Sequence, residues 1–140
     1  AVGYTTLYGD MSGGFAPIQD VYKTNVFKLC KYVNQVKQKE VIPLSIINRP
    51  PSAELRENQK DSDSLPDYAM LDDILKDYLE KNMSIKQMSQ IHDVDIVKKV
   101  VKLVDKSEYK RRQAAPGIKI TRRNFGKDWR VPITNRYSEN

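Results

Sequence analysis

Apolar residues recur at intervals of three and four along much of the chain, which is the spacing of amphipathic helices. The first such stretch predicts a helix that begins at Asp20 and buries one side. The apolar side of this helix holds Tyr22, Val26, Leu29, Cys30 and Val33. Cys30 is therefore expected to be a small buried apolar side chain, whereas Lys23 lies off the stripe.

The second half of the chain predicts three more helices. Short polar side chains accept hydrogen bonds from the first turn of a helix, so they mark helix starts. The expected N-caps are Asp67, Ser84 and either Asp93 or Asp95. The expected apolar positions are Tyr68, Leu71, Ile74, Leu75, Tyr78, Leu79, Ile85, Met88, Ile91, Val97, Val100, Val101 and Val104. Asn82 should end the first of these helices, and Pro116 with Gly117 the last. His92 lies between two helices and is interpreted as a turn residue rather than a catalytic base.

Two segments lack the helical spacing. Residues 1–19 are rich in glycine and hydroxyl side chains, and we expect a loop that bends at Gly13 and Gly14. Residues 52–66 hold many charges and few apolar side chains, which predicts a mobile surface loop that is disordered without ligand. No alternating run is long enough to support a multi-stranded sheet. The pattern alone therefore predicts a mainly α chain.

Length and composition limit the classes of protein. The chain has 140 residues, which fits one domain, and no apolar run approaches the roughly 20 residues that cross a bilayer. The first residues lack the basic and apolar parts of a secretory signal, and the absence of an initiator Met favours a piece of a longer protein. With one cysteine and one histidine, the chain offers no internal disulfide and no zinc site. We expect a protein of the reducing cytoplasm.

The formal net charge of +6 is unevenly distributed, since residues 54–73 are acidic and residues 106–130 strongly basic. The densest basic cluster is Lys110, Arg111 and Arg112 at an expected helix end, where the side chains would fan toward one pole. Three interpretations stay open: solvated surface charge, a phosphate or carboxylate site, or a nucleic-acid interface with aromatic stacking platforms. The aromatic residues between the basic ones are Tyr109, Phe125, Trp129 and Tyr137. No helix-turn-helix, RRM or KH signature accompanies them.

The common phosphate-binding signatures are missing. Ser12, Gly13 and Gly14 resemble the start of the SGGxDS loop that binds pyrophosphate in some ATP-cleaving enzymes. The acid that this loop requires is replaced by apolar residues, beginning with Phe15. Neither GxxxxGK[ST] nor GxGxxG occurs in the sequence. The two glycines are therefore interpreted as an ordinary flexible turn.

Three strings, in the same order, resemble the C-terminal part of NAD+ synthetase, closest to its glutamine-dependent branch. They are GYTTLYGDMSGGFAPIQDVYKT (3–24), IINRPPSAELRENQKDSDSLPDY (46–68) and EYKRRQAAPGIKITRRNFGKDWRVPITNRY (108–137). The similarity covers essentially all 140 residues. It implies that residues 1–140 are the C-terminal portion of an α/β adenine nucleotide α-hydrolase-like (Rossmann-like) synthetase domain whose strands lie mostly upstream.

The resemblance also implies an ATP-dependent carbon–nitrogen ligase that converts nicotinic acid adenine dinucleotide into NAD+. In that family the nicotinate carboxylate attacks the α-phosphate of ATP and releases pyrophosphate. Ammonia then displaces AMP from the mixed anhydride. ATP and Mg2+ are therefore expected as substrate and metal, because the charge that develops on the phosphates must be neutralised.

The resemblance assigns ligand-binding roles residue by residue, and it assigns no catalytic residue. The residues at dinucleotide-binding positions are Tyr4, Thr5, Thr6, Leu7, Asp10 and Lys110. Lys23 matches the lysine that binds ATP phosphate, and Ser52 matches the hydroxyl residue that reaches ATP and its metal. Tyr109 stands where ammonia-dependent relatives commonly have His, which argues against an imidazole role there.

Other parts of the family's machinery lie upstream of the matched strings: the SGGxDS loop, the main Mg2+ ligands and the glutaminase domain with its cysteine nucleophile. Cys30 does not replace that nucleophile, because no matching Glu and Lys surround it. We expect the chain alone to be inactive. For the whole protein we expect ammonia from a glutaminase domain and homo-oligomers, with no membrane partner and no nucleic-acid partner.

Overall fold

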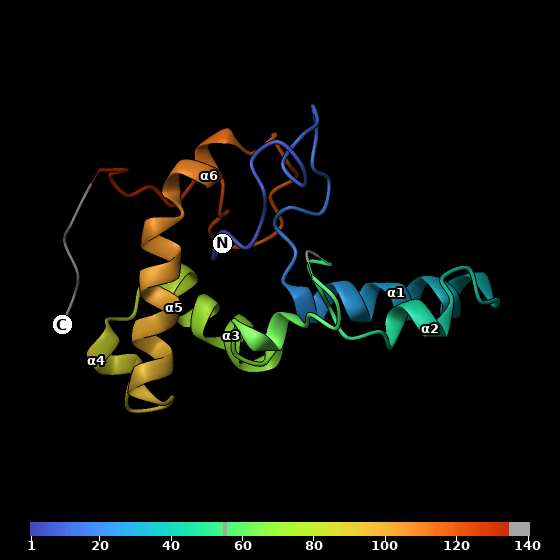
Figure 1. Cartoon of the computed structure of the whole chain (residues 1–140), viewed down its shortest axis with the longest axis horizontal. Helices are drawn as coiled ribbons and strands as arrows, with labels where there is room; N and C mark the ends of the chain where they lie inside the picture. The colour runs from blue at the N-terminus through green and yellow to red at the C-terminus, as the bar shows by residue number, and fades with distance from the viewer. Residues whose placement is uncertain (55, 135–140) are drawn as a thin grey trace. The chain divides into compact units, whose positions relative to one another are not determined.

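The structure is a computed structural model that describes residues 1–54 and 56–134 (Figure 1). Its helices are α1 (Lys23–Lys37), α2 (Leu44–Ile47), the 3-10 turn η1 (Asp61–Asp63), α3 (Tyr68–Leu75), the π-helical turn η2 (Lys76–Glu80), α4 (Ile85–Met88), α5 (Val94–Lys106) and α6 (Glu108–Gln113). The described ranges contain no β-strand. The prediction of a mainly α chain is confirmed. Within these ranges no helix is long and apolar enough to cross a membrane.

The chain divides into two compact units, a division that its length did not indicate. Unit 1 consists of residues 1–21 and 73–140, and unit 2 of residues 22–72. Each unit is described separately below.

The core of unit 1 is built on α5, which packs against α4. Val97, Val100, Val101 and Val104 are buried, as their spacing predicts. Met88 of α4 is fully buried beside the same helix pair, whereas Ile91, an expected apolar contact, is exposed. Burial of these aliphatic side chains supplies the main driving force for folding of the unit.

Local capping bonds fix the helix starts where the sequence places them. The Ser84 hydroxyl accepts a hydrogen bond from the Gln87 amide, and the Gln87 side-chain oxygen accepts one from the Ser84 amide, which completes a capping box. Asp93, rather than Asp95, caps α5 by accepting from the amides of residues 95 and 96. Asp67 accepts from the Ala69 amide at the start of α3. The predicted N-caps are confirmed.

The helix that begins at Tyr68 ends as expected, but its last turn is π-helical. Asn82 adopts the left-handed conformation, with φ of +58°, and closes the segment. Within η2 the buried Asp77 accepts from Lys81 Nζ at 2.7 Å, and Asp77 Oδ2 lies 3.1 Å from His92 Nε2. His92 therefore joins η2 to the corner between α4 and α5, which is consistent with its interpretation as a turn residue.

Two predictions about the first helix are wrong. Asp20 does not open it, because α1 begins at Lys23 and has no side-chain cap. Instead Asp20 is fully buried in unit 1, where its Oδ2 accepts from the Ile120 amide and from the amide and hydroxyl of Thr121. The helical pattern gave no sign of these partners, which lie 100 residues further along the chain.

The apolar stripe of α1 is also not buried. No residue of this helix is buried: Leu29 is 45% exposed and Cys30 is half-buried. An amphipathic face is buried only where another element covers it, and within unit 2 the short α2 packs against α1. The preceding residue, Tyr22, is buried.

The segment 52–66 is only partly a surface loop. The Asp61 amide donates to the Pro51 carbonyl at 2.9 Å, which closes the loop at its base. Asp61 and Leu65 are buried, and the Tyr68 hydroxyl donates to Asp61 Oδ2 at 2.5 Å. The prediction that the whole segment lies on the surface is therefore wrong at Asp61 and Leu65, whereas residues 62–64 between them are exposed. Its mobility without ligand stays a prediction.

Candidate functional site

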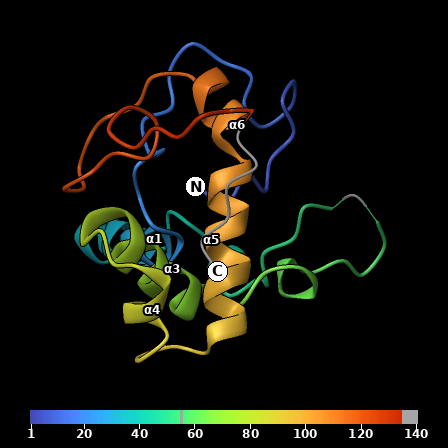
Figure 2. The same ribbon diagram turned by 90° about the vertical axis from the view of Figure 1, so that its left-hand side faces the viewer.

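The N-terminal segment of unit 1 is held against α6 by Lys110. Its Nζ donates hydrogen bonds to the carbonyls of Gly3 and Thr5, both at 2.6 Å. In both views the blue N-terminal trace runs beside the orange α6 (Figures 1 and 2). Residues about 105 positions apart in sequence therefore meet, as the expected dinucleotide site requires.

Glycine is needed at position 3 for this close approach. Gly3 has φ of +69°, a conformation that side chains disfavour. A Cβ atom there would lie 2.1 Å from the Ser107 Oγ at the start of α6. The segment that contains Tyr4 and Thr5 is thus packed directly on the helix.

Asp10 closes a small loop around the next expected ligand residues. Its Oδ2 accepts from the Thr6 amide at 2.8 Å and from the Thr6 hydroxyl at 3.1 Å. The hydrogen bond from the Thr6 amide, followed by that from the Thr6 hydroxyl, lowers the pKa of Asp10, so the carboxylate stays ionised. Asp10 is exposed and Leu7 half-buried. The expected dinucleotide residues Tyr4 to Leu7, Asp10 and Lys110 therefore all belong to unit 1.

Beside Lys110, Arg111 is buried, so the interpretation of the basic cluster as solvated surface charge is wrong for this residue. Its Nη1 donates to the carbonyls of Val104 and Ala1, and its Nη2 donates to Glu108 Oε2 at 2.9 Å. A buried guanidinium needs such partners, because an unpaired charge in the core is costly. The sequence signal for this arrangement is the acid three positions before the arginine on a helix.

Glu108 is the centre of this charge network, a role that was not predicted from the sequence. The side chain is 1% exposed and also accepts from Arg112 Nε at 2.8 Å and from Arg130 Nη1 at 3.3 Å. Burial raises the pKa of Glu108, but hydrogen bonds from Arg112 and Arg111 outweigh burial and hold the pKa below its ordinary value. Glu108 is therefore a buried carboxylate that is compensated by three arginines.

Lys23, the expected ATP ligand, is the first residue of α1 in unit 2. Its ammonium lies 5.5 Å from the centre of the Phe27 ring and 5.8 Å from the centre of the Tyr68 ring. The adjacent Thr24 amide donates to Asp72 Oδ2 at 2.8 Å. The positive charge is thus placed at a helix N-terminus, a position that favours anionic ligands.

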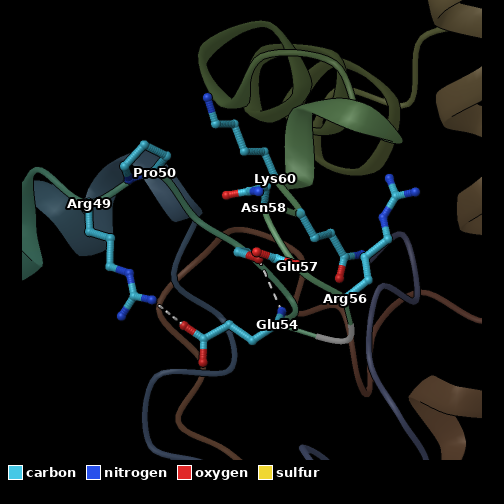
Figure 3. Close-up of a pocket in the computed structure, with 9 residues that line it drawn as sticks. Arg49, Pro50, Glu54, Arg56, Glu57, Asn58 and Lys60 are labelled. Carbon is cyan, nitrogen blue, oxygen red and sulfur yellow. Dashed lines mark hydrogen bonds and ion pairs between the residues drawn. The ribbon is translucent and has the colours of Figure 1, made fainter.

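Ser52, the second expected ATP ligand, lines a cavity of about 690 Å³ in unit 2 that is formed by side chains from 49–54 and 56–60. The Ser52 hydroxyl accepts from the Glu54 amide at 3.0 Å. Figure 3 shows the side chains of Arg49 and Glu54 turned toward each other, joined by a 2.6 Å ion pair, while Arg56 points away from them. Arg56 pairs instead with Asp63 at 3.0 Å. The cavity is therefore lined by charged, mostly exposed side chains.

Two of the aromatic residues that were expected as stacking platforms are packed inside unit 1. Phe125 is buried, and the Trp129 ring packs edge-on against Tyr78 at 5.1 Å with Arg123 over it. Tyr109 is 41% exposed, and Tyr137 lies outside the described residues. Nothing in this region supports the nucleic-acid alternative.

Among residues 1–54 and 56–134, no group of three or more His, Cys, Asp or Glu side chains could hold a metal ion. A metal contact through the Ser52 hydroxyl stays a prediction.

Comparison with known proteins decides the family. The sequence model of the family described as NAD synthase matches residues 1–114. The chain belongs to the NAD synthase family. The resemblance on which the site residues were assigned is thereby confirmed at the level of the family.

Individual relatives agree with this family and indicate its branch. The chain is 51% identical over 140 residues to the glutamine-dependent NAD(+) synthetase of Thermotoga maritima and 54% identical over 138 residues to that of Aquifex aeolicus. These alignments cover 99% and 98% of the chain, but each covers only 24% of the relative. The chain thus spans about a quarter of the length of these synthetases.

A solved structure of a family member is similar in fold. The glutamine-dependent NAD+ synthetase from Acinetobacter baumannii, in complex with adenosine diphosphate, matches 99% of the chain with 45% sequence identity and a TM-score of 0.52. The chain covers 24% of that protein. This relative binds an adenine nucleotide.

Proposed function

We propose that the chain is the C-terminal part of the synthetase domain of a glutamine-dependent NAD+ synthetase. The whole enzyme would use ATP to adenylate the carboxylate of nicotinic acid adenine dinucleotide, and ammonia from glutamine would then displace AMP to give NAD+. The domain as a whole would be of the α/β, Rossmann-like type. The observation that supports this most directly is the identity of about half of all positions with named synthetases across the entire chain.

The arrangement around Lys110 fits a role in binding the dinucleotide. An ammonium group has three N–H donors, and the carbonyls of Gly3 and Thr5 accept two of them. The third donor can bind a carboxylate or a phosphate, with Tyr4 and Thr5 held beside it. Lys110 would thus orient the substrate at its reacting end through a side chain that is already fixed.

The ATP contacts proposed for unit 2 are electrostatic. Lys23 would bind a phosphate of ATP at the N-terminus of α1, where the helix dipole adds to its charge. Ser52 would reach ATP through its hydroxyl. Mg2+, when bound, neutralises charge on the phosphates. We assign Mg2+ ligation to no carboxylate of the described residues, since no group of three or more His, Cys, Asp or Glu side chains among them could hold a metal ion.

The setting of the whole enzyme follows from the family resemblance. We propose that a glutaminase domain supplies the ammonia, that the enzyme forms homo-oligomers and that it works in the cytoplasm. A single cysteine fits a reducing compartment.

The test is an assay of the intact protein and of the 140-residue chain with ATP, Mg2+, nicotinic acid adenine dinucleotide and either glutamine or ammonium. We expect NAD+, AMP and pyrophosphate from the intact protein and no NAD+ from the 140-residue chain. No NAD+ from the intact protein under either nitrogen source would contradict the proposal.

A matched pair of lysine variants tests the site. In Lys110→Ala we expect kcat/KM for the dinucleotide to fall by at least about tenfold, because a charge-assisted hydrogen bond is lost. Lys106→Ala removes an exposed lysine from the last turn of α5 and should leave this constant unchanged. Equal losses in both variants would show that the effect is one of general charge.

A further inference from the structure

Two neighbouring basic residues of α6 fix the path of the N-terminal segment. Residues 1–5 form no helix or strand, so their position depends on the side chains that bind them. Arg111 Nη1 donates to the Ala1 carbonyl at 2.9 Å, and Lys110 Nζ to the carbonyls of Gly3 and Thr5 at 2.6 Å. Three carbonyls at alternate residues are thus held from one helix.

Arg111 is itself held rigidly by its other bonds. Nη1 also donates to the Val104 carbonyl at 2.6 Å, and Nη2 donates to Glu108 Oε2. The arginine and the glutamate are 7% and 1% exposed. A planar guanidinium with several fixed partners has little conformational freedom, so its hydrogen bond holds Ala1 at a fixed position relative to α6.

We propose that Glu108 and Arg111 are positioning residues for the dinucleotide substrate. The buried pair holds the segment 1–5 on α6, so that Tyr4, Thr5 and Lys110 keep one geometry before the substrate binds. Such preorganisation improves binding, since less conformational freedom is lost in the complex. The inference depends on the function proposed above for these three residues.

Arg112 provides a matched control. It also donates to Glu108, at 2.8 Å, but its second hydrogen bond goes to the Val131 carbonyl. Its side chain is 45% exposed. A change at position 112 therefore perturbs the same carboxylate and leaves in place the hydrogen bonds from Lys110 and Arg111 to residues 1–5.

The experiment compares Arg111→Lys and Arg112→Lys in the intact protein by steady-state kinetics. Lysine keeps the charge but cannot bridge Ala1, Val104 and Glu108 with a fixed fork. We expect Arg111→Lys to raise KM for the dinucleotide about tenfold, with kcat and the KM for ATP within about twofold of wild type. Arg112→Lys should leave all three constants near wild type. Equal behaviour of the two variants, or an equal rise in the KM for ATP, would overturn the proposal.

Gly3→Ala disturbs the contact between the N-terminal segment and α6 by changing the segment, and it leaves the charges of α6 intact. An added Cβ would meet Ser107 Oγ at 2.1 Å, so the segment must shift away from the helix. The same selective rise in KM for the dinucleotide is expected. This variant decides the question if Arg111→Lys fails to fold, and an unchanged KM in folded Gly3→Ala would refute the proposal.

Amide hydrogen exchange of the intact protein gives a readout that does not depend on activity. The amides of Thr5 and Thr6 are hydrogen-bonded to Gly3 and Asp10, respectively. Their protection should fall in Arg111→Lys and persist in Arg112→Lys. If the intact protein forms no NAD+, the proposed function fails, whereas unchanged protection in Arg111→Lys refutes the positioning role itself.

Discussion

Two clusters in this chain each pair arginine with glutamate, but one cluster is buried and the other is exposed. At α6, Glu108 and Arg111 are 1% and 7% exposed, and each makes several hydrogen bonds. In unit 2, Arg49 and Glu54 form a pair at 2.6 Å, shorter than the 2.9 Å between Arg111 and Glu108, but are 69% and 63% exposed. Water screens the second pair, whereas the first is shielded from it. The distance between charges therefore says little about their energetic role, and burial decides it.

The largest expected effect is the loss of the buried carboxylate. Glu108→Ala leaves the Arg111 guanidinium in the core without its anionic partner, which we expect to cost about 3–5 kcal/mol in the opening free energy of unit 1. Native-state amide exchange of α5 in the intact protein measures this quantity. A cost below about 1 kcal/mol would show that the buried network is no stronger than an exposed pair.

The second largest effect is expected from acid, which destabilises the fold by protonating the buried carboxylates. Burial raises the pKa of Asp77, but hydrogen bonds from Lys81 and His92 outweigh burial and hold it below its ordinary value, and the pKa of Glu108 is lowered too. Each group then binds a proton more readily in the unfolded chain. Their contribution is complete above the ordinary values of 3.8 and 4.5 and is lost as pH falls through the lower, folded-state values.

The slope of stability against pH tests this directly. Each titrating carboxylate contributes up to about 1.4 kcal/mol per pH unit within its window. We expect the slope below pH 4.5, measured by the exchange of α5 amides, to be shallower in Glu108→Gln than in wild type. Identical slopes would mean that Glu108 does not contribute to acid sensitivity.

The smallest effect is expected in the exposed pair. Glu54→Ala should change local stability in the segment 49–60 by less than about 1 kcal/mol, and 1 M salt should abolish the difference. Arg49→Ala should give the same result, because each variant removes the same screened interaction. The local stability of this segment is measured by hydrogen exchange of the Asp61 amide, which donates to the Pro51 carbonyl at the base of the loop. A loss of several kcal/mol in local stability would show that the exposed pair stabilises the protein as much as the buried network does.

Much of unit 1 could be predicted from the sequence, because the signals are local. Ser84 and Asp93 bond to amides two or three residues away, so their capping roles are visible in any short window. The valine spacing of α5 predicts its buried face for the same reason. The expected dinucleotide residues came instead from the family resemblance, and their proximity to Lys110 depends on contacts between residues about 105 positions apart.

The sequence by itself determined the helical class, the starts of α3, α4 and α5, and the family, since these depend on short spacings and on matched strings. The tertiary structure decided which polar residues are buried. Asp20 looks like an N-cap, but it binds backbone amides 100 residues away, and Arg111 looks like a solvated charge until Glu108 and Ala1 surround it. The apolar stripe of α1 looks like a core face, yet no residue from Lys23 to Lys37 is buried. Burial depends on what packs around a residue in three dimensions, and a helical period specifies only which residues share a side.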